Sequence, residues 1–296
     1  MEEIESKKNH KWLKRFFFIF FIMFIIMLIF LLYSRFVATK GLIIKEYRIV
    51  DSKLSDNFYG IKIAHLSDLH YGTTFSKDDL KELTEKVNLT KPDIIVFTGD
   101  LIDKNAKVEN SDLEALTEAF QNMNATIGKY AVAGDQDQDR FSVVLSNSNF
   151  NILTDTYDLV YKENNIPLLI AGLNSNLKAS ETIDKRIAST IDYLNSLGED
   201  AIKPSYRILL LHEPDYVGDV DLSYFDLALA GHSNGGLIRI PYLGGLFTSQ
   251  GAKKYPNAFY QIDHTKLFVS SGIGTTDMKF RFNNRPSFNL YRLVNK

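Results

Sequence analysis

The sequence predicts a layered α/β domain with a central pair of sheets, preceded by one N-terminal transmembrane helix. Three observations predict it. A long uncharged run lies near the N-terminus, strand and helix patterns then alternate, and the last part of the chain holds several short apolar runs. With 296 residues, 45% of them hydrophobic, the chain can bury one large core or two small ones.

The N-terminal run covers residues 16–33 and contains no charged residue. As a helix it would be ~27 Å long at ~1.5 Å per residue, which is close to the ~30 Å hydrocarbon core of a bilayer. It exceeds the ~7–15 apolar residues of a secretory signal peptide. No face of it is polar, which disfavours a buried core helix. We therefore expect an uncleaved anchor over residues 16–34.

Cations on either side of this run predict its orientation. More of them precede the run than follow it: Lys7, Lys8, Lys11, Lys14 and Arg15 against Arg35 and Lys40. Because the side richer in Lys and Arg stays in the cytoplasm, residues 1–15 are predicted to form a short cytoplasmic N-terminus. A single-pass protein of the cell membrane would then continue through a tether over residues 35–48 into an extracytoplasmic domain over residues 49–296.

Within this domain, alternating patterns predict two strand–helix pairs and a third strand. The strands cover residues 61–66, 93–98 and 130–135, and the two helices are expected to begin at the N-caps Ser76 and Ser111. Later apolar runs predict strands over 167–173, 207–215, 225–236 and 266–274, and one helix over 179–197. Unbroken apolar runs are typical of strands buried on both faces.

Composition excludes several kinds of site. The chain has no cysteine, so it has no disulfide, no thiolate zinc site and no cysteine nucleophile. Its formal net charge is −2, which gives no overall basic field, and nucleic acid is therefore not an expected partner.

Several predicted strands end in Asp, His or Asn close to glycine. These residues are Asp68 and His70, then Asp100 with Asp103, then Asp135, then His212, and last His232 and Asn234. Ligands collect beyond the carboxyl ends of strands in open α/β sheets. Each residue alone is more typical of a turn or of a satisfied core side chain. Five such strand ends together favour a metal site.

The motifs DLH, GDLID, GDQD, LLHEPD and GHSNGG, in this order, resemble those of the calcineurin-like metallophosphoesterase family from about residue 61 to the C-terminus. Residues 270–293 are similar to the tail of its membrane-anchored bacterial branch. The resemblance implies a four-layer α/β/β/α sandwich that holds two divalent ions. It assigns one ion to Asp68, His70, Asp100 and Asn234, and the other to Asp100, Asp135, His212 and His232. Asp103 would orient a ligand.

This resemblance also implies hydrolysis of phosphoester or diphosphate bonds by a dinuclear centre, here at the outer face of the membrane. Two ions ~3.5–4 Å apart can clamp the attacking and leaving oxygens, with Asp100 as the bridge. Asn234 and Asp135 make the site richer in oxygen than the family pattern. Manganese is therefore the preferred metal, with iron, zinc and magnesium as alternatives. A phosphorylated small molecule, a lipid or an envelope polymer is the expected substrate, near the bilayer that holds the helix.

The loop GDQD departs from the family at Gln136, where the family has a histidine that helps to protonate the leaving group or stabilises the transition state. Gln has no titratable proton, and losing a general acid typically costs ~10²–10⁴ in rate. Asp137 or Asp139 is an alternative acid. The site then favours a substrate whose leaving group needs no proton, such as a diphosphate or an aryl phosphate. The alternative to an enzyme is a catalytically weak or inactive domain that binds metal and a phosphorylated ligand.

Charge is a reason to favour a singly charged phosphodiester over a monoester. Two divalent ions carry four positive charges, and the carboxylates of Asp68, Asp100 and Asp135 reduce this to one. Asparagine at position 135, as in the family, would leave two. A less positive centre attracts a doubly charged monoester less strongly than a family site would.

Overall fold

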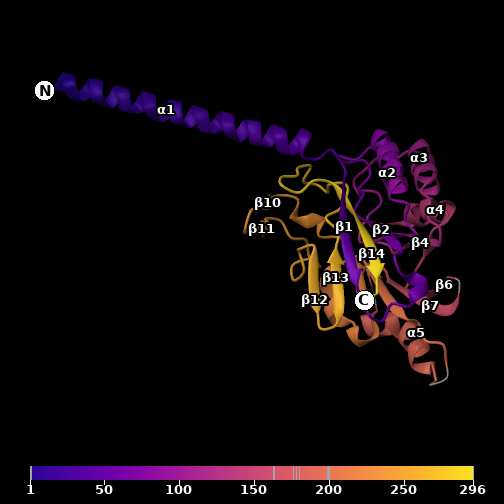
Figure 1. Ribbon diagram of the computed structural model, residues 1–296. Coiled ribbons are helices and arrows are strands. Elements are labelled where there is room, and N and C mark those ends of the chain that lie inside the picture. The colour runs from indigo at the N-terminus through magenta and orange to yellow at the C-terminus, as the bar shows by residue number, and fades with distance from the viewer. Residues whose placement is uncertain are drawn as a thin grey trace.

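Two six-stranded sheets form the centre of the molecule in the computed structural model (Figure 1), which describes residues 2–162, 164–175, 177, 179, 181–198 and 201–295. This arrangement confirms the predicted α/β class with two sheets and covering helices. The first sheet runs in the order β1 (Ile43–Val50), β14 (Ser287–Val294), β2 (Lys62–Leu66), β3 (Ile94–Phe97), β4 (Gly128–Ala131), β5 (Asn151–Ile152). Strands β2 to β5 are parallel, whereas β14 is antiparallel to β2 and parallel to the edge strand β1.

The second sheet also has a parallel centre. Its order is β12 (Phe259–Ile262), β13 (Thr265–Val269), β9 (Leu227–Ala230), β8 (Tyr206–Leu211), β7 (Asn164–Leu173), β6 (Thr156–Lys162), with only the two edge strands antiparallel to their neighbours. A short separate hairpin, β10 (Arg239–Ile240) and β11 (Gly244–Gly245), lies between β9 and β12 in the sequence. The carboxyl ends of the parallel strands in both sheets carry the predicted ligands.

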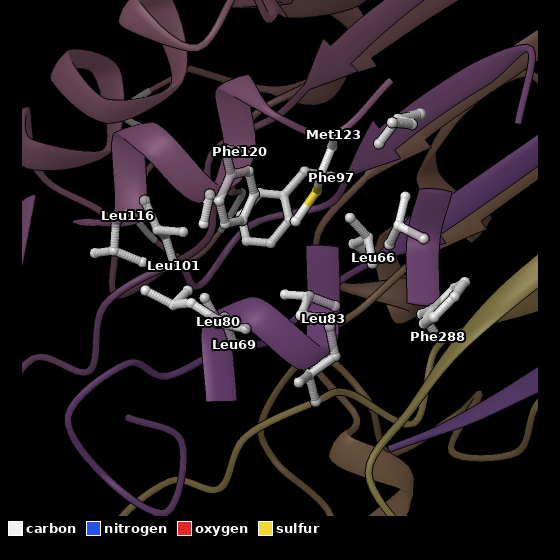
Figure 2. Close-up of a cluster of buried hydrophobic side chains, with 14 of the residues drawn as sticks. Leu66, Leu69, Leu80, Leu83, Phe97, Leu101, Leu116, Phe120, Met123 and Phe288 are labelled. Atoms are coloured by element: carbon white, nitrogen blue, oxygen red, sulfur yellow. The ribbon is translucent and has the colours of Figure 1, made fainter. Parts of the chain in front are cut away.

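Helices cover the outer face of each sheet. The first sheet is covered by α2 (Lys77–Thr90), α3 (Asn110–Gln121) and α4 (Asp139–Asn147), and the second by α5 (Ile183–Ser196). Side chains alternate between the two faces of β3: Phe97 packs with the helices (Figure 2), whereas Val96 lies in the core between the sheets. Burial on both faces explains the unbroken apolar runs in the sequence.

Several element boundaries differ from the predictions. Helix α3 begins at Asn110 because Glu109 and Asp112 form its capping box, so Ser111 is not the N-cap. Helix α5 begins at Ile183 rather than at residue 179, after Thr182 in an extended N-cap conformation. Strands β8 and β9 end at Leu211 and Ala230, earlier than predicted, because the ligand-bearing loops start there.

The N-terminal helix α1 (Glu2–Leu32) continues into a π-helical turn over Tyr33–Val37 and projects away from the sheets (Figure 1). The stretch Trp12–Val37 is long and apolar enough to cross a membrane by length and composition. Strand β1 then begins at Ile43 and pairs along its whole length with β14. The segment predicted as a tether, 35–48, therefore includes part of the sheet, because β14 offers it an open edge that the sequence does not reveal.

Candidate metal centre

Five strand ends bring the predicted ligands together at one edge of the two sheets. Asp68 and His70 follow β2, Asp100 follows β3, Asp135 follows β4, His212 follows β8, and His232 and Asn234 follow β9. They form two groups with one shared member: Asp68, His70 and Asp100; and Asp100, Asp135, His212 and His232. Within each group, one ligand atom of every residue lies within 4.8 Å of the others. Asn234 lies beside the first group, so the structure brings together all seven predicted ligands.

The backbone at these ligands is unusual. Five of them have a left-handed conformation, with φ values of 52°, 42°, 59°, 63° and 46° at Asp68, His70, Asp100, His232 and Asn234. Such conformations cost roughly 1–3 kcal/mol at residues other than glycine and cluster at functional sites. Each of these five residues lies two to four positions beyond the end of its strand. Sequence alone gives no direct sign of this backbone conformation.

Close packing holds the β3 and β4 loops against each other. A Cβ on Gly134 would lie 2.3 Å from Asp100 Oδ1, so only glycine fits there. Asp137 completes the junction, because its Oδ2 accepts hydrogen bonds from the backbone N–H groups of Asp100 and Gly134, both at 2.8 Å. Its Oδ1 accepts from Leu101 N at 2.9 Å. Asp137 thus fixes the position of Asp100 through the backbone of the two loops.

The two histidines of the second group are held in one tautomer. His212 Nδ1 lies 2.6 Å from the carbonyl oxygen of Thr98, and His232 Nε2 lies 2.7 Å from that of Gln250. A carbonyl oxygen only accepts hydrogen bonds, so these nitrogens carry the protons. The other two nitrogens are 3.1 Å apart and point at each other.

Asp135 completes this second group. Its Oδ1 lies 3.3 Å from His212 Nε2 and 3.2 Å from His232 Nδ1, and it has no hydrogen-bond partner. Two imidazole lone pairs and a carboxylate oxygen at this spacing repel one another unless a positive charge binds between them. The donor set therefore fits a divalent cation.

Asp100 connects the two groups through one oxygen. Its Oδ2 lies 3.6 Å from His70 Nε2 and 3.4 Å from His212 Nε2, while Oδ1 accepts a hydrogen bond from Gln136 N. Asn234 Nδ2 lies 3.4 Å from the same nitrogen of His70, Nε2, and Asn234 Oδ1 is buried with no hydrogen-bond partner. Rotating the amide by half a turn would present this oxygen as a ligand.

Electrostatics at the site favour bound positive charge. Burial by itself would lower the pKa of His212, but the carboxylates of Asp100 and Asp135 raise this pKa well above its ordinary value. Burial raises the pKa of Asp68. Burial, and then the Asp100 charge, raises the pKa of Asp137 to about 7. A divalent cation would replace the proton on the imidazole and keep the carboxylates ionised.

Gln136 and Asp103 lie at the rim of the centre. Gln136 is half-buried, and its Oε1 accepts a hydrogen bond from Lys104 N at 3.2 Å, so its amide oxygen is turned toward the β3 loop. Asp103 Oδ2 lies 3.9 Å from His70 Nδ1, on the side of the ring that faces away from the first group. This position suits a residue that orients His70.

Sequence reasoning missed the two carbonyl groups that orient the histidines and the structural role of Arg281. Arg281 is fully buried, and its guanidinium donates to the carbonyls of Ser271, Gly272 and Gly274. This loop lies against Asp68, whose carbonyl accepts from Gly274 N at 2.8 Å. The burial of Arg281 and the carbonyls of Thr98 and Gln250 could not be recognised from sequence, because backbone carbonyls carry no residue signature and a lone Arg in a polar loop is typical of a solvated residue.

Comparisons with known proteins agree with this geometry. Residues 61–236 match the family model described as calcineurin-like phosphoesterase. The chain is 27% identical over 266 residues to the uncharacterized metallophosphoesterase YkuE of Bacillus subtilis, covering 88% of each protein. It is 29% identical to an uncharacterized metallophosphoesterase of Aquifex aeolicus, covering 83% of this chain and 89% of that protein. Among solved structures, Plasmodium GAP50, described as the anchor in the inner membrane complex, aligns with a TM-score of 0.45 and 12% identity over 78% of this chain and 80% of that one.

Proposed function

The chain belongs to the calcineurin-like phosphoesterase family, and on that premise we propose that it hydrolyses phosphodiester or diphosphate bonds at the outer face of a membrane. The observation that carries the proposal is the pair of ligand groups that share Asp100. Two ions bound there would neutralise charge on the phosphorus oxygens and lower the pKa of water, which are the two main contributions of a dinuclear site.

Individual residues would have separate roles in this reaction. Asp68, His70 and Asn234 would hold one ion, and Asp135, His212 and His232 the other, with Asp100 between them. The carbonyls of Thr98 and Gln250 keep the two imidazoles of the second group ready to bind metal. Asp137 would act as a positioning residue for Asp100, because both of its carboxylate oxygens already accept backbone hydrogen bonds.

Gln136 supports the preference for substrates whose leaving group needs no proton, such as diphosphates and aryl esters, and Asp135 supports the preference for diesters over monoesters. Gln136 can donate a hydrogen bond but cannot release a proton to a leaving group. Asp135 adds a negative charge to the second ligand group, which disfavours a doubly charged monoester. Gln136 also supports a second candidate function, a domain that binds metal and a phosphorylated ligand with little or no turnover. Turnover by the metal-loaded protein separates the two.

Metal reconstitution tests the proposal directly. Full-length protein stripped of metal is expected to bind two divalent ions and to hydrolyse bis(4-nitrophenyl) phosphate, with higher turnover in manganese than in zinc, because oxygen ligands favour harder ions. Metal analysis and a panel of monoester, diester and pyrophosphate substrates would measure this. Stoichiometric metal binding without turnover of any of these substrates would favour the binding domain instead. Higher turnover with zinc would contradict the proposed effect of Asp135 and Asn234.

A membrane topology also follows from the sequence. We propose that the stretch Trp12–Val37 is an uncleaved anchor and that the N-terminus is cytoplasmic. Protease added to intact cells or protoplasts is then expected to digest the domain that follows Arg35, as detected by an antibody against the C-terminus. Complete protection until the membrane is opened would contradict this orientation, and release of the domain without the helix would identify a cleaved signal sequence.

A further inference from the structure

The β10–β11 hairpin has an apolar surface that no described residue covers. At its turn, Tyr242 is fully exposed and Leu243 is 77% exposed, and Leu246 and Phe247 after β11 are about half-exposed. Large apolar side chains gathered on one projecting loop are uncommon in a freely solvated protein and mark an interaction surface. The contacts at the base of the hairpin indicate what that surface meets.

The base of the hairpin is joined to the N-terminal helix through Phe282. Phe282 N donates to the carbonyl of Leu237 at 3.1 Å, and its carbonyl accepts from Arg239 N at 2.9 Å. The ring of Phe282 packs on Phe30 of α1, with 4.8 Å between the centroids. Phe30 belongs to the stretch that is long and apolar enough to cross a membrane. The hairpin therefore leaves the domain at the level of that helix, and Figure 1 shows β10 and β11 on the side toward which α1 extends.

The segment that carries the hairpin is connected to the metal centre at both of its ends. Asn234 and its two glycine neighbours lead directly into Leu237 and β10. After β11 the chain returns to Gln250, whose carbonyl accepts the hydrogen bond from His232 Nε2. Strand β1 begins near the end of the helix and runs parallel to β14, which is antiparallel to β2. The edge where β2 ends and the ligands begin is therefore the edge that faces the helix.

A cationic cavity of about 460 Å³ lies between the hairpin base, the end of the helix and the loop of Asn234. Lys45, Arg239 and Arg285 line it together with Tyr33, and none of its described lining residues is acidic. Burial, and then the charges of Arg281 and Arg239, lower the pKa of Lys45 to about 8, so three cationic side chains lie close together here. A cationic cavity next to an apolar projection matches the phosphate layer and the acyl layer of a bilayer.

We propose that the β10–β11 hairpin enters the lipid surface beside α1, and that it thereby presents the metal centre to the phosphate of a lipid headgroup, which is the substrate class. The second half of this inference rests on the proposed function, whereas the first half does not. A second copy of the chain or a soluble protein could also cover Tyr242 and Leu243, and the experiment below separates these occupants from lipid.

The natural absence of cysteine allows a direct test of insertion. Full-length protein would be placed at one copy per lipid nanodisc, with an environment-sensitive fluorophore on Tyr242→Cys or on the matched control Tyr161→Cys. Tyr161 is also exposed and lies on β6. Strands β6 and β12 are the two edge strands of the second sheet, so Tyr161 lies at the edge opposite β12. Nitroxide-labelled lipids are expected to quench the label at position 242 severalfold more than the label at 161. Equal quenching would overturn the inference, and a shielded label only in discs that hold two copies would assign the surface to a second chain.

A second arm tests the substrate class. The double variant Tyr242→Asp and Leu243→Asp is expected to lose about tenfold or more of its activity on phosphatidylglycerol in the disc, because burial of two apolar side chains is lost. Its activity on soluble bis(4-nitrophenyl) phosphate should remain within about twofold of the parent, since neither residue contacts the ligand groups. An equal loss on both substrates would overturn the lipid assignment. If the parent hydrolyses neither substrate, the proposed function fails, and insertion is still decided by the quenching measurement.

Discussion

The variant Asp100→Asn is expected to lose about 10³-fold or more in kcat/KM on a phosphodiester, and to bind both metal ions more weakly. The reason is the position of its carboxylate. Oδ2 faces His70 and His212, one from each ligand group, while Oδ1 accepts from Gln136 N. The amide introduced at position 100 would turn its NH₂ group either toward His70 and His212 or toward the N–H of Gln136. In both orientations the variant lacks the negative charge that two ions would share. Charge stabilisation by metals is worth several kcal/mol, and each ~1.4 kcal/mol is tenfold in rate.

Two further variants make this measurement specific. Asp277→Asn removes an exposed carboxylate that hydrogen-bonds Asn105, outside the ligand groups, and is expected to leave metal content and activity unchanged. Asp103→Asn alters the carboxylate whose Oδ2 lies 3.9 Å from His70 Nδ1, and is expected to cost roughly 10–100-fold in metal affinity or activity if this carboxylate orients the ring. Metal content, measured by mass spectrometry, and kcat/KM should both be unchanged in Asp277→Asn, lower in Asp103→Asn and lowest in Asp100→Asn. Retention of two tightly bound ions by Asp100→Asn would show that the ligand assignment is wrong.

The seven predicted ligands could be selected from the sequence because parallel strands deliver their carboxyl ends to one edge. An apolar run that stops at Asp or His near glycine is visible without coordinates, and five such runs identify the edge. The features that prepare the ligands are not visible in this way. The left-handed backbone at Asp68 and His232, and the carbonyls of Thr98 and Gln250 that set the histidine tautomers, depend on contacts between distant segments.

The same holds for the fold: the sequence predicts elements with a local pattern, and it does not predict elements that depend on contacts between distant segments. The unbroken apolar run of β3 and the apolar faces of α2 and α3 are local patterns, so these elements were predictable. Strand β1 was not, because the sequence IIKEYRIV lies shortly after the apolar stretch Trp12–Val37 and its partner β14 lies at the other end of the chain. The hairpin gave no signal as a strand pair, since each of its strands has only two residues.

The variant Gln136→His is expected to raise turnover of a diester with a poor leaving group by about tenfold or more, within the ~10²–10⁴ that a general acid can supply. Position 136 is suited to this role because its backbone N–H binds Asp100 Oδ1 and its side chain is half-buried at the rim of the centre. In the parent, the amide oxygen of Gln136 accepts from Lys104 N and the side chain has no proton to release. An imidazole would add one near neutral pH. The same change should matter little for a nitrophenyl ester, whose leaving group departs without a proton.

The competing explanation is that Asp137 already supplies the acid, and the contacts of Asp137 predict a different outcome. Three backbone N–H groups, from Asp100, Leu101 and Gly134, point at its two oxygens. Asp137→Asn would turn an NH₂ group toward one of these donors and displace Asp100. Its activity should therefore fall by a similar factor on methyl and nitrophenyl esters, together with metal content, as expected of a positioning residue. An acid would instead affect only the poor leaving group and leave metal content intact. If Asp137→Asn behaves in that second way and Gln136→His gains nothing, Asp137 is the acid and Gln136 fills space at the rim.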